Sequence, residues 1–221
     1  MSIVNRLLPI AILVAVVMFV RAPFVINNAP YESTMGLVQK IFYFHVPAAI
    51  MSFLSAFVCG IASIVYLVTR KRSADHVAVA AAELVVLFGL LVLVTGPLWA
   101  RKAWGVWWQW EARLTMTLVL WMIFVAYMLL RRFGGAGSDV LAAAVGLFGM
   151  ALVPFVYWSV NVWRTLHPTT NVVMSLPPEM LAPFAWTSSA FLVLYLVLLA
   201  VRVRLEATRA ALEDAFLASE D

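Results

Sequence analysis

The sequence predicts an all-α integral membrane protein with six transmembrane helices and with both termini in the cytoplasm. Of its 221 residues, 65% are hydrophobic and only 12% are charged, whereas soluble domains carry about 25% charged residues. A helix of roughly 20 apolar residues crosses the hydrocarbon of a bilayer and satisfies its own backbone hydrogen bonds there. Six stretches meet this requirement within one membrane domain, 1–221: about 7–25, 41–69, 77–98, 114–130, 140–160 and 184–201.

The first stretch, 7–25, is long for the apolar core of a signal peptide, so we expect a retained helix. The orientation of the helices follows from Lys and Arg, which concentrate in cytoplasmic loops. With the N-terminus inside, most of the 15 basic residues lie in the cytoplasm, clustered at helix ends. These inner residues are Arg6, Arg70, Lys71, Arg72, Arg131, Arg132, Arg202, Arg204 and Arg209. The loops 26–41, 99–113 and 161–183 then all face outward.

Composition also excludes several classes of function. The net charge of +4 reflects the topology-setting basic residues, and no Lys/Arg-rich stripe typical of a nucleic-acid-binding surface occurs. The single cysteine, Cys59, cannot form an intramolecular disulfide or a Cys-x-x-Cys-His motif for covalent haem attachment. The chain contains no Gly-Lys pair and therefore no nucleotide-hydrolysing phosphate loop.

The outer loop 99–113 contains a segment that reads Trp-Gly-Val-Trp-Trp-Gln-Trp-Glu over residues 104–111, called the tryptophan segment below. Tryptophan is common at membrane interfaces, but an interface does not require four tryptophans so close together. If the segment is helical, Trp110 points elsewhere and the remaining large side chains share one face. That face presents Trp104, Trp107, Trp108 and Glu111. Such a platform suits a flat aromatic ligand, either a porphyrin or a quinone.

Two histidines, His45 and His167, lie just beyond the expected outer ends of two different helices. Small residues on the helix of His45 let another helix approach closely, so His45 should face the bundle. Neutral imidazoles are good ligands for haem iron, and we predict both histidines as its axial ligands. His76, on the inner side, is expected to be an ordinary surface residue. A zinc site is not expected, because it requires about four close ligands.

Four outer cations are candidates for contacts with the carboxylates of such a ligand. They are Arg101, Lys102, Arg113 and Arg164. Contacts with lipid headgroups explain each of them equally well. One carboxylate, Glu83, lies inside the third apolar stretch, where an unpaired charge is costly. A subunit contact and an approach of the side chain to the interface both explain its position.

These motifs resemble those of the haem exporter protein C family, whose tryptophan signature is written WGxWWxWD. The residues from Trp104 to Thr115 resemble this signature, although Glu111 stands where the signature has Asp. Phe44-His45-Val46-Pro47-Ala48-Ala49 and Thr165-Leu166-His167 resemble the two histidine motifs of the family. Length and helix number agree as well, so the resemblance covers nearly the whole chain.

The resemblance implies a function in cytochrome c biogenesis at the bacterial inner membrane. Haem b would be held on the periplasmic side by His45, His167 and the tryptophan segment, and then passed to a periplasmic haem chaperone. A small single-helix helper protein and the subunits of an ATP-binding cassette transporter are the implied protein partners, beside membrane lipid. Such transfer forms no covalent bond, so the chain is expected to contain no catalytic residue.

Two alternatives to haem transfer remain from the residues alone. A quinol oxidoreductase subunit with intramembrane haem would place histidine pairs deep inside the helices, and neither outer histidine is deep. A solute permease would carry broken helices and polar groups near the bilayer midplane, where this chain has few. Glu111 also has two explanations. It interacts with the positive end of the following helix dipole, or it orients Arg113 or a tryptophan nitrogen.

Overall fold

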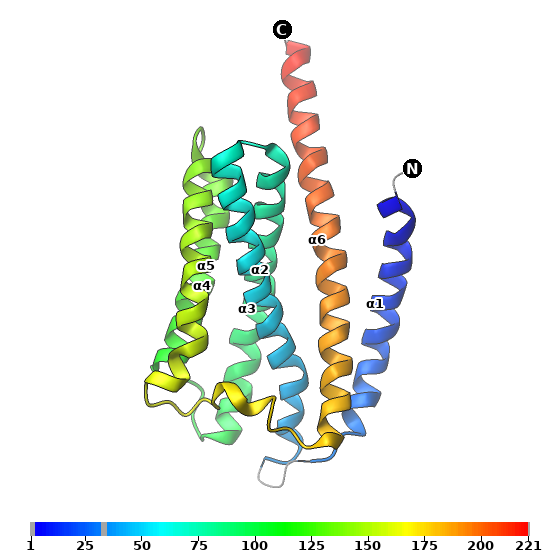
Figure 1. Ribbon diagram of the computed structural model, residues 1–221, viewed down its shortest axis with the longest axis vertical. Coiled ribbons are helices and arrows are strands. Elements are labelled where there is room, and N and C mark those ends of the chain that lie inside the picture. The colour runs from blue at the N-terminus through cyan, green and yellow to red at the C-terminus, as the bar shows by residue number, and fades with distance from the viewer. Residues whose placement is uncertain (1–2, 32–34, 221) are drawn as a thin grey trace.

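The computed structural model describes residues 3–31 and 35–220, which form six long α-helices and two short 3-10 helices (Figure 1). No strand occurs within these residues. The elements are α1 (Ile3–Asn27), η1 (Leu37–Ile41), α2 (Phe42–Thr69), α3 (Arg72–Ala103), α4 (Ala112–Phe133), α5 (Ser138–Val162), η2 (Thr170–Val172) and α6 (Pro178–Glu220). All six α-helices are long and apolar enough to cross a membrane. The predicted fold class is therefore confirmed.

Five of the six helices extend further than the apolar stretches that predicted them, and α2 keeps the bounds of its stretch to within one residue. The largest extension is in α6, which continues to Glu220 instead of ending near residue 201. Hydropathy marks only the part of a helix that suits hydrocarbon, whereas a helix in water continues where charged side chains pair along it. In α6 such pairs join Arg202 to Glu206 and Arg209 to Glu213, each over 3.0 Å.

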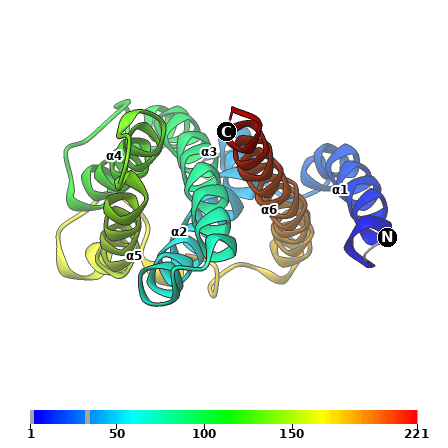
Figure 2. The same cartoon turned by 90° about the horizontal axis from the view of Figure 1, so that it is seen from above.

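Helices α2, α3, α4 and α5 form a four-helix bundle, and α6 packs along α2 and α3 (Figure 2). Helix α1 packs on α6 at the edge of the molecule. Small residues bring α2 and α5 together, because a Cβ atom at Gly146 would lie only 2.9 Å from Ser63 Oγ and 3.0 Å from Cys59 Sγ. Ala56 and Cys59 are fully buried on the same side of α2. The small-residue stripe of α2 therefore faces the bundle, as expected.

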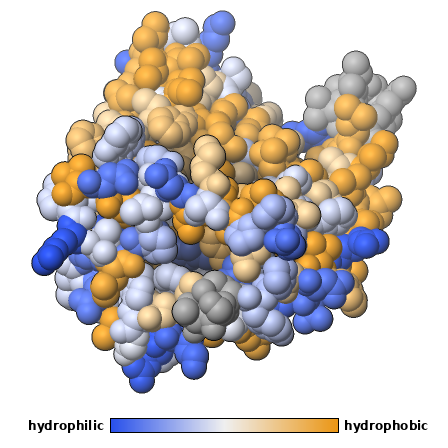
Figure 3. Space-filling model, turned by 60° about the horizontal axis from the view of Figure 1, so that its bottom comes forward, coloured by the Kyte–Doolittle hydropathy of each residue, from blue (hydrophilic) through white to orange (hydrophobic). Residues whose placement is uncertain are grey.

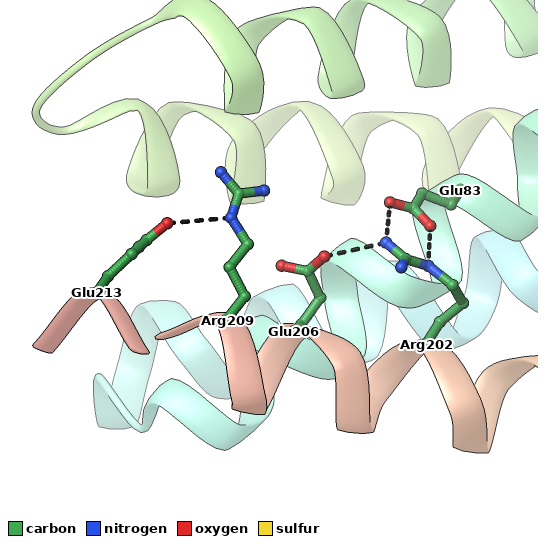
Figure 4. Close-up of polar contacts among 5 residues, drawn as sticks. All are labelled: Glu83, Arg202, Glu206, Arg209 and Glu213. Carbon is green, nitrogen blue, oxygen red and sulfur yellow. Dashed lines mark hydrogen bonds and ion pairs between the residues drawn. The ribbon is translucent and has the colours of Figure 1, made fainter. Parts of the chain in front are cut away.

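Glu83 is paired inside the protein. Arg202 of α6 donates hydrogen bonds to both carboxylate oxygens of Glu83 and, over 3.0 Å, to Glu206 (Figure 4). Removing the partner of a buried charge is strongly destabilising, because the remaining charge is left without compensation. The ion pair links α3 to α6, so neither a subunit contact nor an approach to the interface is needed to explain Glu83.

The two ends of the bundle differ in character. Both termini lie at one end, together with the α2–α3 and α4–α5 turns that carry the basic residues (Figure 1). The three connections predicted to face outward lie together at the opposite end, called the loop end below. Seen from this end, polar side chains gather on the surface while apolar side chains cover the flanks (Figure 3). The loops 26–41, 99–113 and 161–183 therefore lie at the same end of the bundle, which their predicted shared outward orientation requires.

Candidate functional site

His45 lies in the first turn of α2 at the loop end and faces α3. Its Nδ1 atom is 2.9 Å from the Oγ1 atom of Thr95. The Thr95 hydroxyl donates its own hydrogen to the carbonyl oxygen of Leu91 over 2.7 Å, so Oγ1 can only accept from the imidazole. Nδ1 therefore carries the hydrogen, and the lone pair of the neutral ring lies on Nε2.

Gly96 also lies beside the His45 ring. A Cβ atom at this position would lie 3.4 Å from His45 Cε1, an ordinary van der Waals distance. Gly96 directly follows Thr95 on α3, so two adjacent residues of α3 border the ring. Neither residue was identified from the sequence. The available signal was a hydroxyl and a glycine at the outer end of the third apolar stretch, at the expected height of His45.

His167 lies in the loop of residues 163–169, called the His167 loop, and its ring has the same tautomer. The helix that would have carried it outward ends at Val162, because Trp163 has extended backbone angles (φ −107°, ψ 152°). His167 Nδ1 lies 2.8 Å from the carbonyl oxygen of Pro168, which can only accept a hydrogen bond. Nδ1 is therefore the donor, and the lone pair again lies on Nε2.

The two histidines lie near one another and near Arg113 of α4. Both His167 and Arg113 lie close enough to His45 to interact with it electrostatically. The Arg113 guanidinium is fixed by hydrogen bonds of 2.7 Å to the carbonyl oxygen of Val156 and 3.0 Å to that of Tyr157, both on α5. Burial, reinforced by the positive charge of Arg113, lowers the pKa of His167 to about 4. The imidazole of His167 is therefore neutral at physiological pH.

The tryptophan segment is irregular, so the shared helical face predicted for Trp104, Trp107, Trp108 and Glu111 does not form. Helix α3 ends at Ala103, and Gly105 adopts a positive φ of 78°, which interrupts any continuation of the helix. Trp110 packs edge-on against Trp108 with ring centroids 5.7 Å apart, instead of pointing away from it. The side chains of Trp107 and Trp110 are 57% and 77% exposed. The segment thus presents aromatic surface to the outside.

Trp104 connects this segment to the helix that contacts His45. Its ring lies edge-on to Trp99 of α3, with centroids 5.2 Å apart. Trp99 follows Thr95 by one helical turn and therefore lies on the same side of α3. Trp99 was not among the predicted site residues, although its spacing from Trp104 could have suggested a paired ring.

Glu111 joins the tryptophan segment to the His167 loop. Its Oε2 atom accepts a hydrogen bond from the backbone N–H of Leu166 over 2.7 Å. Its Oε1 atom and the Nε1 atom of Trp108 are buried without a hydrogen-bond partner among the described residues. An open hollow lies where the two segments meet. It is lined by Gln109, Trp110, Glu111, Arg164, Thr165 and Leu166.

The four predicted cations have different surroundings. Arg113 lies beside the histidines, and Arg164 lines the hollow. Arg101 turns back to the carbonyl oxygen of Gly105 and lies 6.0 Å from the ring centre of Trp107. Lys102 is exposed in the last turn of α3. His76, the histidine that was not predicted to bind haem, lies in the first turns of α3, at the end of the bundle opposite the loop end.

The loop end thus combines two imidazole nitrogens with free lone pairs, a fixed cation near both rings and exposed aromatic rings. These groups suit a planar, anionic metalloporphyrin, which takes axial nitrogen ligands, cations for its carboxylates and flat apolar contacts.

Comparison with known proteins agrees with this chemistry. The chain matches the family described as Heme exporter protein C over residues 1–217. It is 34% identical to Heme exporter protein C of Escherichia coli over 183 residues, which cover 80% of this chain and 73% of the relative. The proteins of that name from Bradyrhizobium diazoefficiens and Paracoccus denitrificans are 36% and 32% identical, over 82% and 87% of this chain and 71% and 82% of theirs. The chain therefore belongs to the Heme exporter protein C family.

Proposed function

We propose that this protein binds haem b at the loop end, with His45 and His167 as axial ligands, and transfers it to a periplasmic haem chaperone. Its family gives it a role in haem export for cytochrome c maturation. The proposal rests mainly on one observation: the imidazole rings of His45 and His167 have the same tautomer. Each donates from Nδ1 to a fixed oxygen and keeps the Nε2 lone pair for a metal. Histidines that bind metals are commonly held in this way, because the second hydrogen bond fixes tautomer and orientation.

The surrounding residues have distinct roles in this proposal. Arg113 and Arg164 supply positive charge for the haem propionates, and Trp107 and Trp110 provide exposed rings against the porphyrin edge or the chaperone. Haem is cargo here, and the protein holds it through reversible coordination of the iron, without a covalent bond to the porphyrin. The energy would come from an ATP-binding cassette transporter, assembled with this chain and a single-helix helper. The loop end would face the periplasm, because the opposite end carries the clustered basic residues.

The test is a haemin titration of the purified protein in detergent, followed by optical spectroscopy and by electron paramagnetic resonance of the ferric haem. We expect the unmodified protein to give a six-coordinate low-spin spectrum. His45→Ala and His167→Ala should each lose that spectrum and bind haemin more weakly, while His76→Ala should behave like the unmodified protein. Full low-spin occupancy in the His45→Ala, His167→Ala double variant would overturn the proposal.

A second measurement addresses delivery. The haem-loaded protein is mixed with a purified periplasmic haem chaperone, and the haem content of each is measured after separation. Haem should move to the chaperone in proportion to the initial low-spin occupancy. Turnover of a quinol with no transfer of haem would instead favour the oxidoreductase alternative.

A further inference from the structure

Glu111 occupies the residue directly before α4, with extended backbone angles (φ −96°, ψ 165°). An acidic or hydroxyl side chain at such a position usually accepts a hydrogen bond from the first N–H groups of its own helix. In the described residues, the Glu111 side chain makes no such cap. The carboxylate is directed instead to a residue that lies 55 positions later in the chain.

Glu111 contacts the chain directly beside His167. Glu111 Oε2 binds the N–H of Leu166, the residue immediately before His167. The hydrogen bonds of His167 itself run to Thr165 and Pro168, both within its own loop. Those local bonds fix how the ring is oriented within the loop, but they do not fix where the loop lies relative to the helices. The bond from Glu111 supplies that connection, because it joins the His167 loop to the start of α4.

We infer that Glu111 is a positioning residue that holds the His167 loop against the start of α4 and thereby sets the place of the second haem ligand. This inference rests on the proposed function. It also assigns a reason for the departure from the family signature. Asp is one methylene shorter and is a favoured helix cap, whereas Glu reaches across to the loop. What the contact requires is an acceptor oxygen at that reach, and a neutral amide oxygen also provides one.

The experiment compares Glu111→Ala, Glu111→Gln and Glu111→Asp by haemin titration and by the rate at which added imidazole replaces an axial ligand. We expect Glu111→Ala to bind haemin through His45 and to exchange its other ligand about tenfold faster, because the hydrogen bond that positions the His167 loop is lost. Glu111→Gln should remain close to the unmodified protein, and Glu111→Asp should resemble Glu111→Ala. Glu179→Ala, which removes an exposed carboxylate from the first turn of α6, is the matched control and should change nothing.

Combined variants separate a positioning role from a purely structural one. In a His167→Ala background, Glu111→Ala should have no further effect on haemin affinity, whereas in a His45→Ala background its effect should remain. Equal effects of Glu111→Ala on haemin affinity in both backgrounds would overturn the inference. So would a rate of axial-ligand exchange in both Glu111→Ala and Glu111→Asp that equals the rate of the unmodified protein. If His167→Ala itself leaves haemin binding unchanged, the proposed function fails. If His167→Ala weakens binding and Glu111→Ala does not, only the role of Glu111 fails.

Discussion

From the hydrogen bond between His45 and Thr95, we predict how strongly a substitution of Thr95 weakens haemin binding. Thr95→Val replaces the hydroxyl by a methyl group of nearly the same volume, so His45 Nδ1–H loses the acceptor that lies 2.9 Å away. Leaving a buried donor without a partner costs about 1–3 kcal/mol, and loss of a partner of a metal-binding histidine typically weakens metal affinity by about 10–100-fold. We therefore expect haemin to bind Thr95→Val about 10–100-fold more weakly.

The assay is a haemin titration of the purified protein, with thermal unfolding of the haem-free protein measured in parallel. The fold should persist, because the bond from Thr95 to Leu91 that is also lost lies within one helix. Thr95→Ser keeps the hydroxyl and should retain most of the affinity. Thr187→Val removes a comparable bond to helix carbonyls in α6 and serves as the control. Unchanged haemin affinity in Thr95→Val would refute the assigned tautomer of His45.

Three further outcomes are expected. The pKa of His167 is lowered to about 4, so protons should compete for its lone pair only near that pH. Bound haem should therefore persist to about pH 5 and leave near pH 4. Half-release above pH 6, close to the usual histidine pKa of about 6.5, would contradict this. Trp107→Ala removes an exposed ring and should weaken haem binding or transfer with little change in thermal stability, whereas Trp121→Ala, which removes the hydrogen bond from the indole to the bundle, should mainly lower stability. Arg202→Ala should lower the free energy of unfolding by about 1–3 kcal/mol, because the pair with Glu83 is only about one-quarter exposed. Chemical unfolding of the Arg202→Ala, Glu83→Gln double variant should show that part of this loss is recovered.

The sequence by itself determined the membrane fold and the end of the bundle that carries the candidate site. Apolar length and the placement of basic residues are local properties, and the environment that they report is the bilayer. Six stretches long enough to span it require that alternate loops share a side. His45, His167 and the tryptophan segment therefore had to lie at the same end of the molecule. The helix ends were less predictable, because hydropathy does not register the charged turns that extend α6 to Glu220.

Only the tertiary structure decided how the site residues are held. The tryptophan segment lies outside the helices, where apolar periodicity no longer governs the backbone, and the positive φ of Gly105 ended the helix that the spacing had suggested. The partners of the key groups are also distant along the chain: Thr95 for His45, and Leu166 for Glu111. A hydrogen bond depends on a few ångströms of separation and on direction. Those quantities are set by how helices and loops pack, which no local pattern of residues encodes.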